Sequence, residues 1–380
     1  MESLPKTRAI VDLDAIVHNY RSISAAAKGA LIMAVIKADA YGHGAIPVAR
    51  ELEREGCGYF AVATLEEARK MREAGFSTPV IILGYTPPEF GFELAQLGIT
   101  QAVGDLPSAR LLAQGARRAQ KPLKIHIKLD TGMVRFGFDC RDGHQRIIDD
   151  VLACCELDGL IPEGIFTHFA EADNPGSSFT MEQFRRFTDA IGTLRERGRE
   201  FKIRHASNSG AIMYFPETIL DAVRPGIILY GLRPDADVPE TMPLVPAMSL
   251  ETTVVRSDRL RAGESLGYGR SFKAERDMTV ATLAAGYADG YSRRLSNGGK
   301  VYVNGKRAPV RGRICMDMCM AQCEAKQGDV VTLFGKANGC DITLDEIAQK
   351  LGTISYELAC LVGNRVTRIY CKDGKEILRV

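Results

Sequence analysis

The chain has 380 residues, of which 46% are hydrophobic and 25% are charged, and its 49 basic residues nearly balance 47 acidic ones. This length suits two domains, or one barrel with an appended unit. The net charge of +2 gives no sign of a surface for nucleic acid or membrane.

The N-terminus and the cysteines point to a cellular compartment. No apolar signal segment begins the chain, and no apolar run approaches the roughly 20 residues that span a bilayer. Ten cysteines are scattered along the sequence. We therefore expect a cytoplasmic protein with reduced thiols, not a disulfide framework.

From Leu31 to about Gly231, apolar strand-like runs alternate with helical patterns. The spacing Thr180-x-x-Gln183 predicts a capping box at the start of one of these helices. The predicted strands are Ile32–Lys37, Tyr59–Thr64, Val80–Gly84, Gln101–Gly104, Lys124–Asp130, Gly164–His168, Ile203–Ser207 and Gly226–Tyr230. Strands alternating with helices predict an α/β fold, a (β/α)8 TIM-type barrel. The main alternative is an open doubly wound sheet, but no Gly-x-Gly-x-x-Gly follows the first strand.

From about Val238 the pattern changes, and strands become frequent while helices become scarce. Asn304-Gly305 predicts a type I′ hairpin turn, and Leu344–Leu351 predicts one short helix. The predicted strands are Ser249–Val255, Thr279–Ala284, Lys300–Val303, Ala308–Cys315 and Asp329–Phe334. We therefore expect a barrel domain over residues 1–237 and a mostly β C-terminal domain over residues 238–380.

Cys315, Cys319 and Cys323 recur at equal spacing, which raises the possibility of a metal or iron–sulfur site. The segment contains no paired Cys-x-x-Cys, and no histidine follows Cys315. If this segment is a strand, residues four apart face the same side. Core packing is therefore the favoured interpretation, and we expect no metal.

The stretch Ala34–Gly44, AVIKADAYGHG, is the most informative part of the chain. The apolar run that precedes Lys37 is typical of a buried strand, so Lys37 is expected at the mouth of the barrel. A partly desolvated amine there loses its proton more easily and can attack an aldehyde, as in a Schiff base with pyridoxal phosphate. Lys37 taken alone would favour a surface lysine that ends a strand, but the whole eleven-residue string favours the functional interpretation.

Other predicted strands also end in polar side chains. These are Lys128 with Asp130, His168, Asn208 with Ser209, and Arg224. Each has a structural alternative: a satisfied core histidine, an ion pair, an ordinary turn or a carbonyl cap. Their joint placement at the C-terminal ends of successive strands favours one functional site.

Two turns have the composition of a phosphate site. They are Asn208-Ser209-Gly210 and Arg224-Pro225-Gly226-Ile227, in which backbone N–H groups and a hydroxyl are available to an anion. Two ordinary turns of a barrel are the alternative.

In the predicted β domain, two tyrosines stand between glycines, in Leu266–Arg270 (LGYGR) and Gly286–Gly290 (GYADG). Such a ring is open to close approach by another molecule, although a β-bulge with a packed ring is the alternative.

Nine strings occur in order between Lys37 and Arg365 or adjoin that range: VIKADAYGHG, KLDTGMVRFGF, THFAEAD, HASNSGA, VRPGIILYG, LGYGR, AAGYADGYSRRL, GRICMDM and ISYELAC. In these strings the chain resembles the alanine racemase family. The resemblance implies an isomerase that uses pyridoxal 5′-phosphate to interconvert L-alanine and D-alanine, and so supplies D-alanine for peptidoglycan. It also implies a homodimer with shared active sites and a small-molecule substrate, without a nucleic-acid or membrane partner.

The resemblance implies two catalytic residues. Lys37 would carry the cofactor as a Schiff base and act as the base on one face of the substrate. Tyr268, reaching in from the partner subunit, would be the base on the other face. Two opposed bases suit racemisation, because one removes the Cα proton and the other delivers a proton from the opposite side.

The resemblance also implies a set of cofactor contacts. Arg224 would face the pyridine nitrogen, with His168 supporting it. Because arginine keeps its proton, we infer that the ring becomes a poorer electron sink, which limits transamination. The other cofactor-binding residues would be Tyr41, Asn208, Ser209, Gly226, Ile227 and Tyr356.

For the substrate carboxylate, the resemblance implies Arg135 and the backbone of Met316. Lys128 matches a lysine that is carbamylated in many members, and a carbamate there would orient Arg135. Val134 stands where we expect glycine in many members.

An entrance is implied as well. Tyr287 and Tyr356 would line it, with Asp317 and Arg293 in the outer shell.

Other functions remain open at this level. One is a racemase of another amino acid such as serine or lysine, although the bulky ring of Tyr356 favours a substrate no larger than alanine. A non-catalytic pyridoxal-phosphate-binding protein would not need Tyr268 or the β domain. A Schiff-base aldolase would bind a carbonyl substrate directly, without a cofactor.

Overall fold

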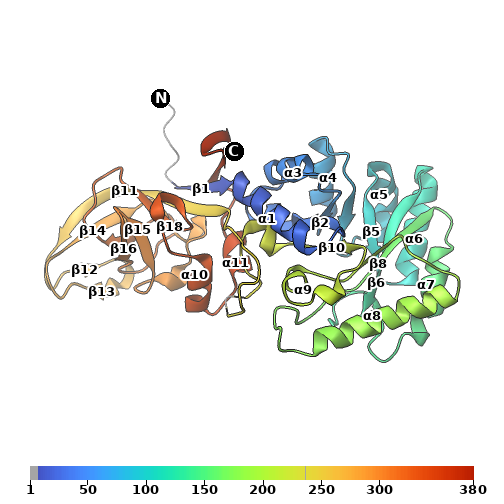
Figure 1. Cartoon of the computed structure of the whole chain (residues 1–380). Helices are drawn as coiled ribbons and strands as arrows, with labels where there is room; N and C mark the ends of the chain where they lie inside the picture. The colour runs from blue at the N-terminus through green and yellow to red at the C-terminus, as the bar shows by residue number, and fades with distance from the viewer. Residues whose placement is uncertain (1–6, 236) are drawn as a thin grey trace.

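The computed structural model describes residues 7–235 and 237–380. A barrel and a β domain lie beside each other, with α11 (Ser355–Cys360) between them (Figure 1). Residues 1–6 and 236 of the expected barrel domain lie outside the described residues.

Within the described chain, eight parallel strands close into a barrel because each pairs with both of its neighbours. In order around the barrel, the strands are β2 (Leu31–Val35), β3 (Tyr59–Val62), β4 (Val80–Ile82), β5 (Thr100–Val103), β6 (Leu123–Asp130), β8 (Leu160–Phe166), β9 (Ile203–His205) and β10 (Ala222–Val223). The short β7 (Phe138–Asp139) pairs with the end of β6. The predicted fold class is confirmed.

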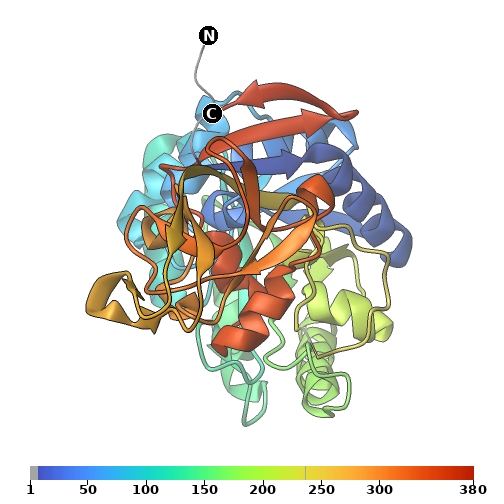
Figure 2. The same ribbon diagram turned by 90° about the vertical axis from the view of Figure 1, so that its left-hand side faces the viewer.

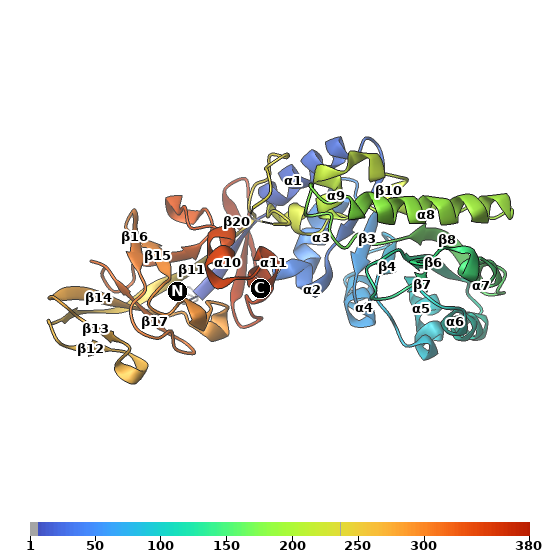
Figure 3. The same cartoon turned by 90° about the horizontal axis from the view of Figure 1, so that it is seen from below.

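Helices cover the outside of this barrel, and the long α8 runs along one side (Figure 3). They are α1 (Leu13–Ala26), α3 (Ala45–Arg54), α4 (Leu65–Glu73), α5 (Gly91–Leu97), α6 (Leu106–Ala119), α7 (Gln145–Cys155), α8 (Phe179–Glu196) and α9 (Ser209–Tyr214). In α8, Phe187, Ala190 and Leu194 recur at helical spacing and are buried against the barrel.

The predicted capping box at Thr180 is wrong. Helix α8 begins at Phe179, so Thr180 lies inside it. The Gln183 side chain instead accepts from the Ala170 N–H at 2.8 Å and donates to the His168 carbonyl at 3.2 Å. Gln183 therefore holds the loop that follows β8, and this tertiary role overrides the local motif.

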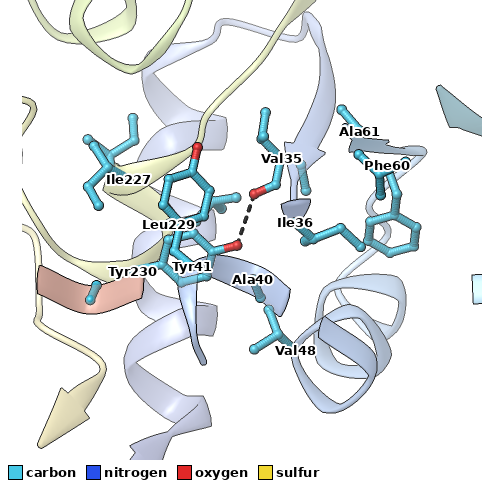
Figure 4. Packing of buried hydrophobic residues seen from close by; sticks show 14 of the residues in the cluster. Val35, Ile36, Ala40, Tyr41, Val48, Phe60, Ala61, Ile227, Leu229 and Tyr230 are labelled. Carbon is cyan, nitrogen blue, oxygen red and sulfur yellow. Dashed lines mark hydrogen bonds between the residues drawn. The ribbon is translucent and has the colours of Figure 1, made fainter. Parts of the chain in front are cut away.

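The predicted strand Gly226–Tyr230 is also wrong. The eighth barrel strand is β10, and Ile227–Tyr230 form the short 3-10 helix η3. An apolar run that is buried on all sides carries no periodicity to separate strand from helix. The Tyr230 hydroxyl donates to the Val35 carbonyl at 2.9 Å, and Ile227 and Leu229 pack beside the end of β2 (Figure 4).

The N-terminal strand β1 (Thr7–Asp12) lies outside the barrel. It pairs antiparallel with β11 (Met248–Leu260) and parallel with β19 (Thr367–Lys372). Figure 2 shows this blue strand beside the red C-terminal strands. Although β1 precedes the barrel in sequence, it joins the sheet of the β domain, because partners about 240 residues away in sequence give β1 its place.

The rest of the β domain is built around the same sheet. Its other strands are β14 (Met278–Leu283), β15 (Lys300–Val303), β16 (Lys306–Pro309), β17 (Cys319–Gln322), β18 (Val330–Phe334) and β20 (Lys375–Arg379). A separate hairpin is formed by β12 (Ser265–Leu266) and β13 (Phe272–Lys273), and α10 (Leu344–Leu351) lies beside α11. The predicted turn at Asn304-Gly305 is confirmed by positive φ at both residues, and the predicted helix matches α10.

One predicted strand of this domain is misplaced. Ala308–Cys315 is not continuous, because β16 ends at Pro309 and only an isolated bridge, Val310 to Ala321, follows. Cys315 therefore shares no strand with Cys319, which is fully buried in β17. Across the described residues, none of the helices is both long and apolar enough to cross a membrane.

Candidate active site

A cavity of about 450 Å³ opens at the C-terminal mouth of the barrel. All nine residues predicted to bind the cofactor line it: Lys37, Tyr41, His168, Asn208, Ser209, Arg224, Gly226, Ile227 and Tyr356. Eight of them follow β2, β8, β9 and β10, and Tyr356 comes from α11. The barrel brings them together because parallel strands all end at the same face.

Lys37 begins a turn of unusual backbone conformation, α2 (Lys37–Tyr41). The four residues from Ala38 to Tyr41 all have φ between 51° and 54°, the left-handed region. This conformation costs roughly 1–2 kcal/mol per non-glycine residue, so surrounding contacts must hold it. No sequence motif for this turn was apparent, because none of the four residues is glycine.

Contacts from both units hold the left-handed turn. The Glu67 carboxylate accepts from the Ala38 N–H at 2.7 Å, and Asp39 accepts from the Ala45 N–H at 2.7 Å. Buried Arg368, on β19, donates to the Gly42 carbonyl at 3.1 Å from one guanidinium nitrogen and at 3.2 Å from another. The β domain therefore fixes the segment that carries Lys37.

The walls of the cavity lower the pKa of Lys37. Desolvation is the main cause, and the nearby guanidinium of Arg135 adds to it, while Glu67 acts in the opposite direction. A lowered pKa increases the neutral fraction of the amine, which is the nucleophilic form. The environment of Lys37 is thus that of a reactive lysine.

On the opposite wall, a small polar cradle is formed by the turns after β9 and β10. The Ser209 hydroxyl accepts from the Gly226 N–H at 2.9 Å, and Asn208 caps α9 through the Ala211 N–H at 3.0 Å. A Cβ on Gly226 would stand 2.7 Å from the Tyr41 hydroxyl, so a larger residue there would displace the Tyr41 ring. These hydroxyls, with the N–H groups at the start of α9 and η3, suit a phosphate.

Arg224 is buried and held on several sides. Its guanidinium contacts His205 Nδ1 at 2.7 Å and His168 Nδ1 at 3.4 Å. It also donates to the carbonyls of Thr167 and Ala206, each at 2.8 Å. Burial lowers the pKa of Arg224 to about 9, so it remains a cation at neutral pH.

His205 is the main polar residue of the site that the sequence analysis missed. It lies in the string HASNSGA, three residues before Asn208, and is fully buried. Its ring stacks on Phe166 with centroids 4.7 Å apart. His168, which was predicted to support Arg224, makes the longer of the two histidine contacts to its guanidinium.

Lys128 and Asp130 do not form the ion pair that was the alternative for this motif. Asp130 accepts from the backbone N–H groups of Gly132, Val134 and Arg135 at 2.9–3.0 Å. Although burial opposes ionisation, these bonds lower the pKa of Asp130. Asp130 therefore fixes the loop that presents Arg135.

The Lys128 amine is buried and, among the described residues, lacks a hydrogen-bond partner. It lies 5.2 Å from the centre of the Phe166 ring. Burial, together with the guanidinium groups of Arg224 and Arg135, lowers the pKa of Lys128 to about 7. Such an amine is readily neutral and suited to covalent modification.

Apart from Tyr356, the predicted residues of the β domain lie outside the cavity lining. Tyr268, in η4 (Tyr268–Arg270), is 68% exposed, and Tyr287 and Met316 are exposed as well. The hairpin that carries Tyr268 stands at the end of the β domain remote from the barrel (Figure 3). A single chain therefore does not bring Tyr268 to Lys37.

A second group of β-domain residues is organised around Met316. The Ala288 N–H donates to the Met316 carbonyl at 3.0 Å, which ties the GYADG string to Met316. Asp317 pairs with Arg365 at 2.8 Å, and Arg293 lies in the short helix η6 (Arg293–Leu295).

The barrel mouth thus combines a reactive lysine, a polar cradle that suits a phosphate, and a buried arginine. This combination defines the class of barrel enzymes that hold pyridoxal phosphate through a lysine. Residues 11–234 match the family model "Alanine racemase, N-terminal domain", and residues 247–370 match "Alanine racemase, C-terminal domain".

Individual relatives agree with these models. Alanine racemase from Clostridium tetani is 42% identical over 372 residues, covering 96% of this chain and 95% of the relative. The solved alanine racemase of Clostridium difficile 630 superposes with a TM-score of 0.95 at 35% identity, covering 100% and 99% of the two chains. A Bartonella henselae alanine racemase with covalently bound pyridoxal phosphate has a TM-score of 0.87 at 30% identity, covering 97% and 100%.

The chain belongs to the alanine racemase family. The family's enzymes are isomerases that depend on pyridoxal phosphate and interconvert L-alanine and D-alanine, the D-alanine serving peptidoglycan synthesis. The expected family, activity and cofactor are therefore confirmed.

Proposed function

We propose that the two alanine enantiomers interconvert at the barrel cavity, with Lys37 of one subunit and Tyr268 of a second copy as the two bases. The observation that carries this proposal is the position of Lys37. Its pKa is lowered in a cavity that also contains the polar cradle and Arg224. When bound, pyridoxal phosphate supplies an aldehyde for an amine and a conjugated ring that takes up charge from Cα.

The residues of the cavity suit this cofactor. Tyr41, Ser209 and Tyr356 offer hydroxyls to the phosphate, the backbone of Gly226 and Ile227 offers N–H groups, and Asn208 orders the turn. Arg224 would donate a hydrogen bond to the pyridine nitrogen and would keep its own proton, because its pKa of about 9 lies above neutral pH. His168, held neutral by burial, accepts from Arg224.

Arg135 and the backbone N–H of Met316 would bind the substrate carboxylate, the latter from the second copy. Asp130 orients the loop of Arg135 through three backbone bonds. We propose that Lys128 is carbamylated, because its amine is buried without a partner between two guanidinium groups. An anion there would pair with Arg135.

We further propose a homodimer with shared sites. Support comes from the exposure of Tyr268, Tyr287, Met316 and Met318 on the β domain, since large exposed apolar side chains mark interaction surfaces. In such a dimer, Tyr287 and Tyr356 would line the entrance, with Asp317 and Arg293 behind them. We also propose a barrel domain to residue 237 and a β domain from residue 238, and a cytoplasmic location consistent with ten free cysteines.

Incubation with L-alanine in deuterated water tests the reaction, with serine and lysine in parallel. D-alanine that carries deuterium at Cα is expected. Exchange with serine or lysine but not with alanine would show that another amino acid is the substrate. No exchange with any amino acid would refute racemisation.

Mixing two inactive variants tests the shared site. Lys37→Ala and Tyr268→Phe homodimers lack one base in every site, whereas a hybrid dimer has one intact site. Random exchange is expected to restore about a quarter of wild-type activity. No recovery, with subunit exchange verified by mass spectrometry, would contradict sharing. A mixture of Lys37→Ala with the double variant Lys37→Ala/Tyr268→Phe is the matched control, because no hybrid then has both bases.

A further inference from the structure

A column of polar side chains crosses the interior of the barrel below the cavity. It consists of Arg224, His205, His126, Glu163 and Lys124, called here the polar column. The interior of such a barrel is ordinarily filled with branched apolar side chains. Burying polar groups is unfavourable unless they are paired, so a continuous column indicates a function.

The contacts of the polar column follow one another from the cavity to the far end of the barrel. Arg224 lies 2.7 Å from His205 Nδ1, and His205 Nε2 lies 2.8 Å from His126 Nδ1. His126 Nε2 faces Glu163 Oε2 at 3.6 Å, just beyond hydrogen-bond distance. Glu163 then pairs with Lys124, near the start of β6, at 2.7 Å.

The direction of the hydrogen bonds is set by Arg224 at one end of the column and by Glu163 at the other. A guanidinium only donates, so His205 must accept at Nδ1 and carry its proton on Nε2. His205 then donates to Nδ1 of His126, which must carry its own proton on Nε2. That proton faces Glu163. An ionised carboxylate can only accept, so it favours an N–H on this side of the His126 ring.

The charge state of Glu163 agrees with this direction. The contact with His126 and the pair with Lys124 lower the pKa of Glu163 to about 2, against the opposing effect of burial. Burial in turn lowers the pKa of both His126 and His205, so both rings are neutral. The column therefore holds the Glu163 anion, two neutral rings of one tautomer, and the cations Arg224 and Lys124 at its two ends.

Two features of the backbone build this arrangement. Strand β8 contains one extra residue at Glu163, because Ile125 pairs with Pro162 whereas the next residue, His126, pairs with Gly164. Such a bulge redirects a side chain, and bulges are frequent next to active sites. A Cβ on Gly164 would stand 2.6 Å from the His126 ring, so glycine makes room for that ring.

We propose that Glu163 is a positioning residue for the racemisation reaction: through His126 and His205 it fixes the tautomer that faces Arg224 and keeps the guanidinium aimed at the cofactor ring. This inference rests on the proposed role of Arg224. No proton has to travel along the column, since each group keeps its own. Loss of the carboxylate charge permits the reverse tautomers, in which His205 directs an N–H at Arg224 and repels it.

The test compares Glu163→Gln with wild type by ¹⁵N NMR of histidine-labelled apoprotein, which is tractable because the chain has six histidines. In wild type, both His126 and His205 are expected as Nε2–H tautomers. In Glu163→Gln, which preserves shape but not charge, both signals are expected to shift toward mixed tautomers. Tyr59→Phe is the matched control, because the Tyr59 hydroxyl donates to the same carboxylate oxygen at 3.2 Å without contacting Arg224.

Kinetics of the holoenzyme provide the second measurement. Glu163→Gln is expected to lower kcat at least about tenfold, the usual effect of losing an outer hydrogen-bond partner, with KM for alanine changed less than about twofold. Unchanged histidine tautomers would overturn the proposal even if kcat falls, and so would unchanged kcat. If wild type racemises no amino acid, the proposed function fails. The NMR comparison of the apoproteins still tests whether Glu163 sets the tautomers of His126 and His205.

Discussion

The buried amine of Lys128 leads to a quantitative prediction about stability. An unfolded-chain lysine titrates near 10.4, whereas burial lowers the pKa of Lys128 to about 7. Between these values the unfolded chain binds more protons than the native protein, so stability rises with pH through this window. With about 1.4 kcal/mol for each pKa unit, the buried ammonium destabilises the apoprotein by roughly 5 kcal/mol at pH 6 and roughly 2 kcal/mol at pH 9.

The substitution Lys128→Met removes this titration while keeping a long apolar side chain against Phe166. Urea unfolding of the apoproteins in bicarbonate-free buffer measures the difference in free energy of unfolding between variant and wild type. This difference is expected to favour Lys128→Met at pH 6 and to shrink by about 3 kcal/mol at pH 9. Lys121→Met, at an exposed position just before β6, is the control.

Two outcomes would refute this reasoning. A difference that stays constant from pH 6 to pH 9 would show that Lys128 is not a desolvated cation in the native protein. Bicarbonate should also stabilise wild type but not Lys128→Met, because a carbamate replaces the cation between Arg224 and Arg135 with an anion. Equal effects of bicarbonate on both proteins would contradict carbamylation at this position.

Three further substitutions test the geometry. Gly42 has φ +80°, and an added Cβ would lie 2.5 Å from the Ala359 carbonyl oxygen. Gly42→Ala should therefore lower the free energy of unfolding in urea by about 2 kcal/mol or more and weaken cofactor binding. Unchanged stability would contradict the packing of α2 on α11. Gly286→Ala places a Cβ 2.3 Å from the Met316 carbonyl oxygen. It should raise KM for alanine with little change in cofactor affinity. An unchanged KM with weakened cofactor binding would contradict this prediction. Val134 has φ 54° and is 64% exposed, so Val134→Asn should stabilise by about 1 kcal/mol, and a loss of stability would argue against strain there.

The order of the elements and the identity of most cavity residues follow from the sequence alone. Alternating apolar runs and helical stripes follow from contacts within a few residues, so the barrel and α10 were predictable from local pattern. Once the barrel was inferred, its parallel strands necessarily brought Lys37, Ser209 and Arg224 to one mouth. The family strings added roles that periodicity does not contain.

Three features could not be predicted from the sequence, because each depends on partners distant in sequence. Strand β1 joins a sheet whose other strands begin at Met248, and the left-handed turn after Lys37 is held by Glu67 and Arg368. The alignment of His205 over His126 arises from the pairing of β9 with β8 and of β8 with β6, including the bulge at Glu163. Local propensity carries no information about such neighbours, since their contacts form only when the barrel closes.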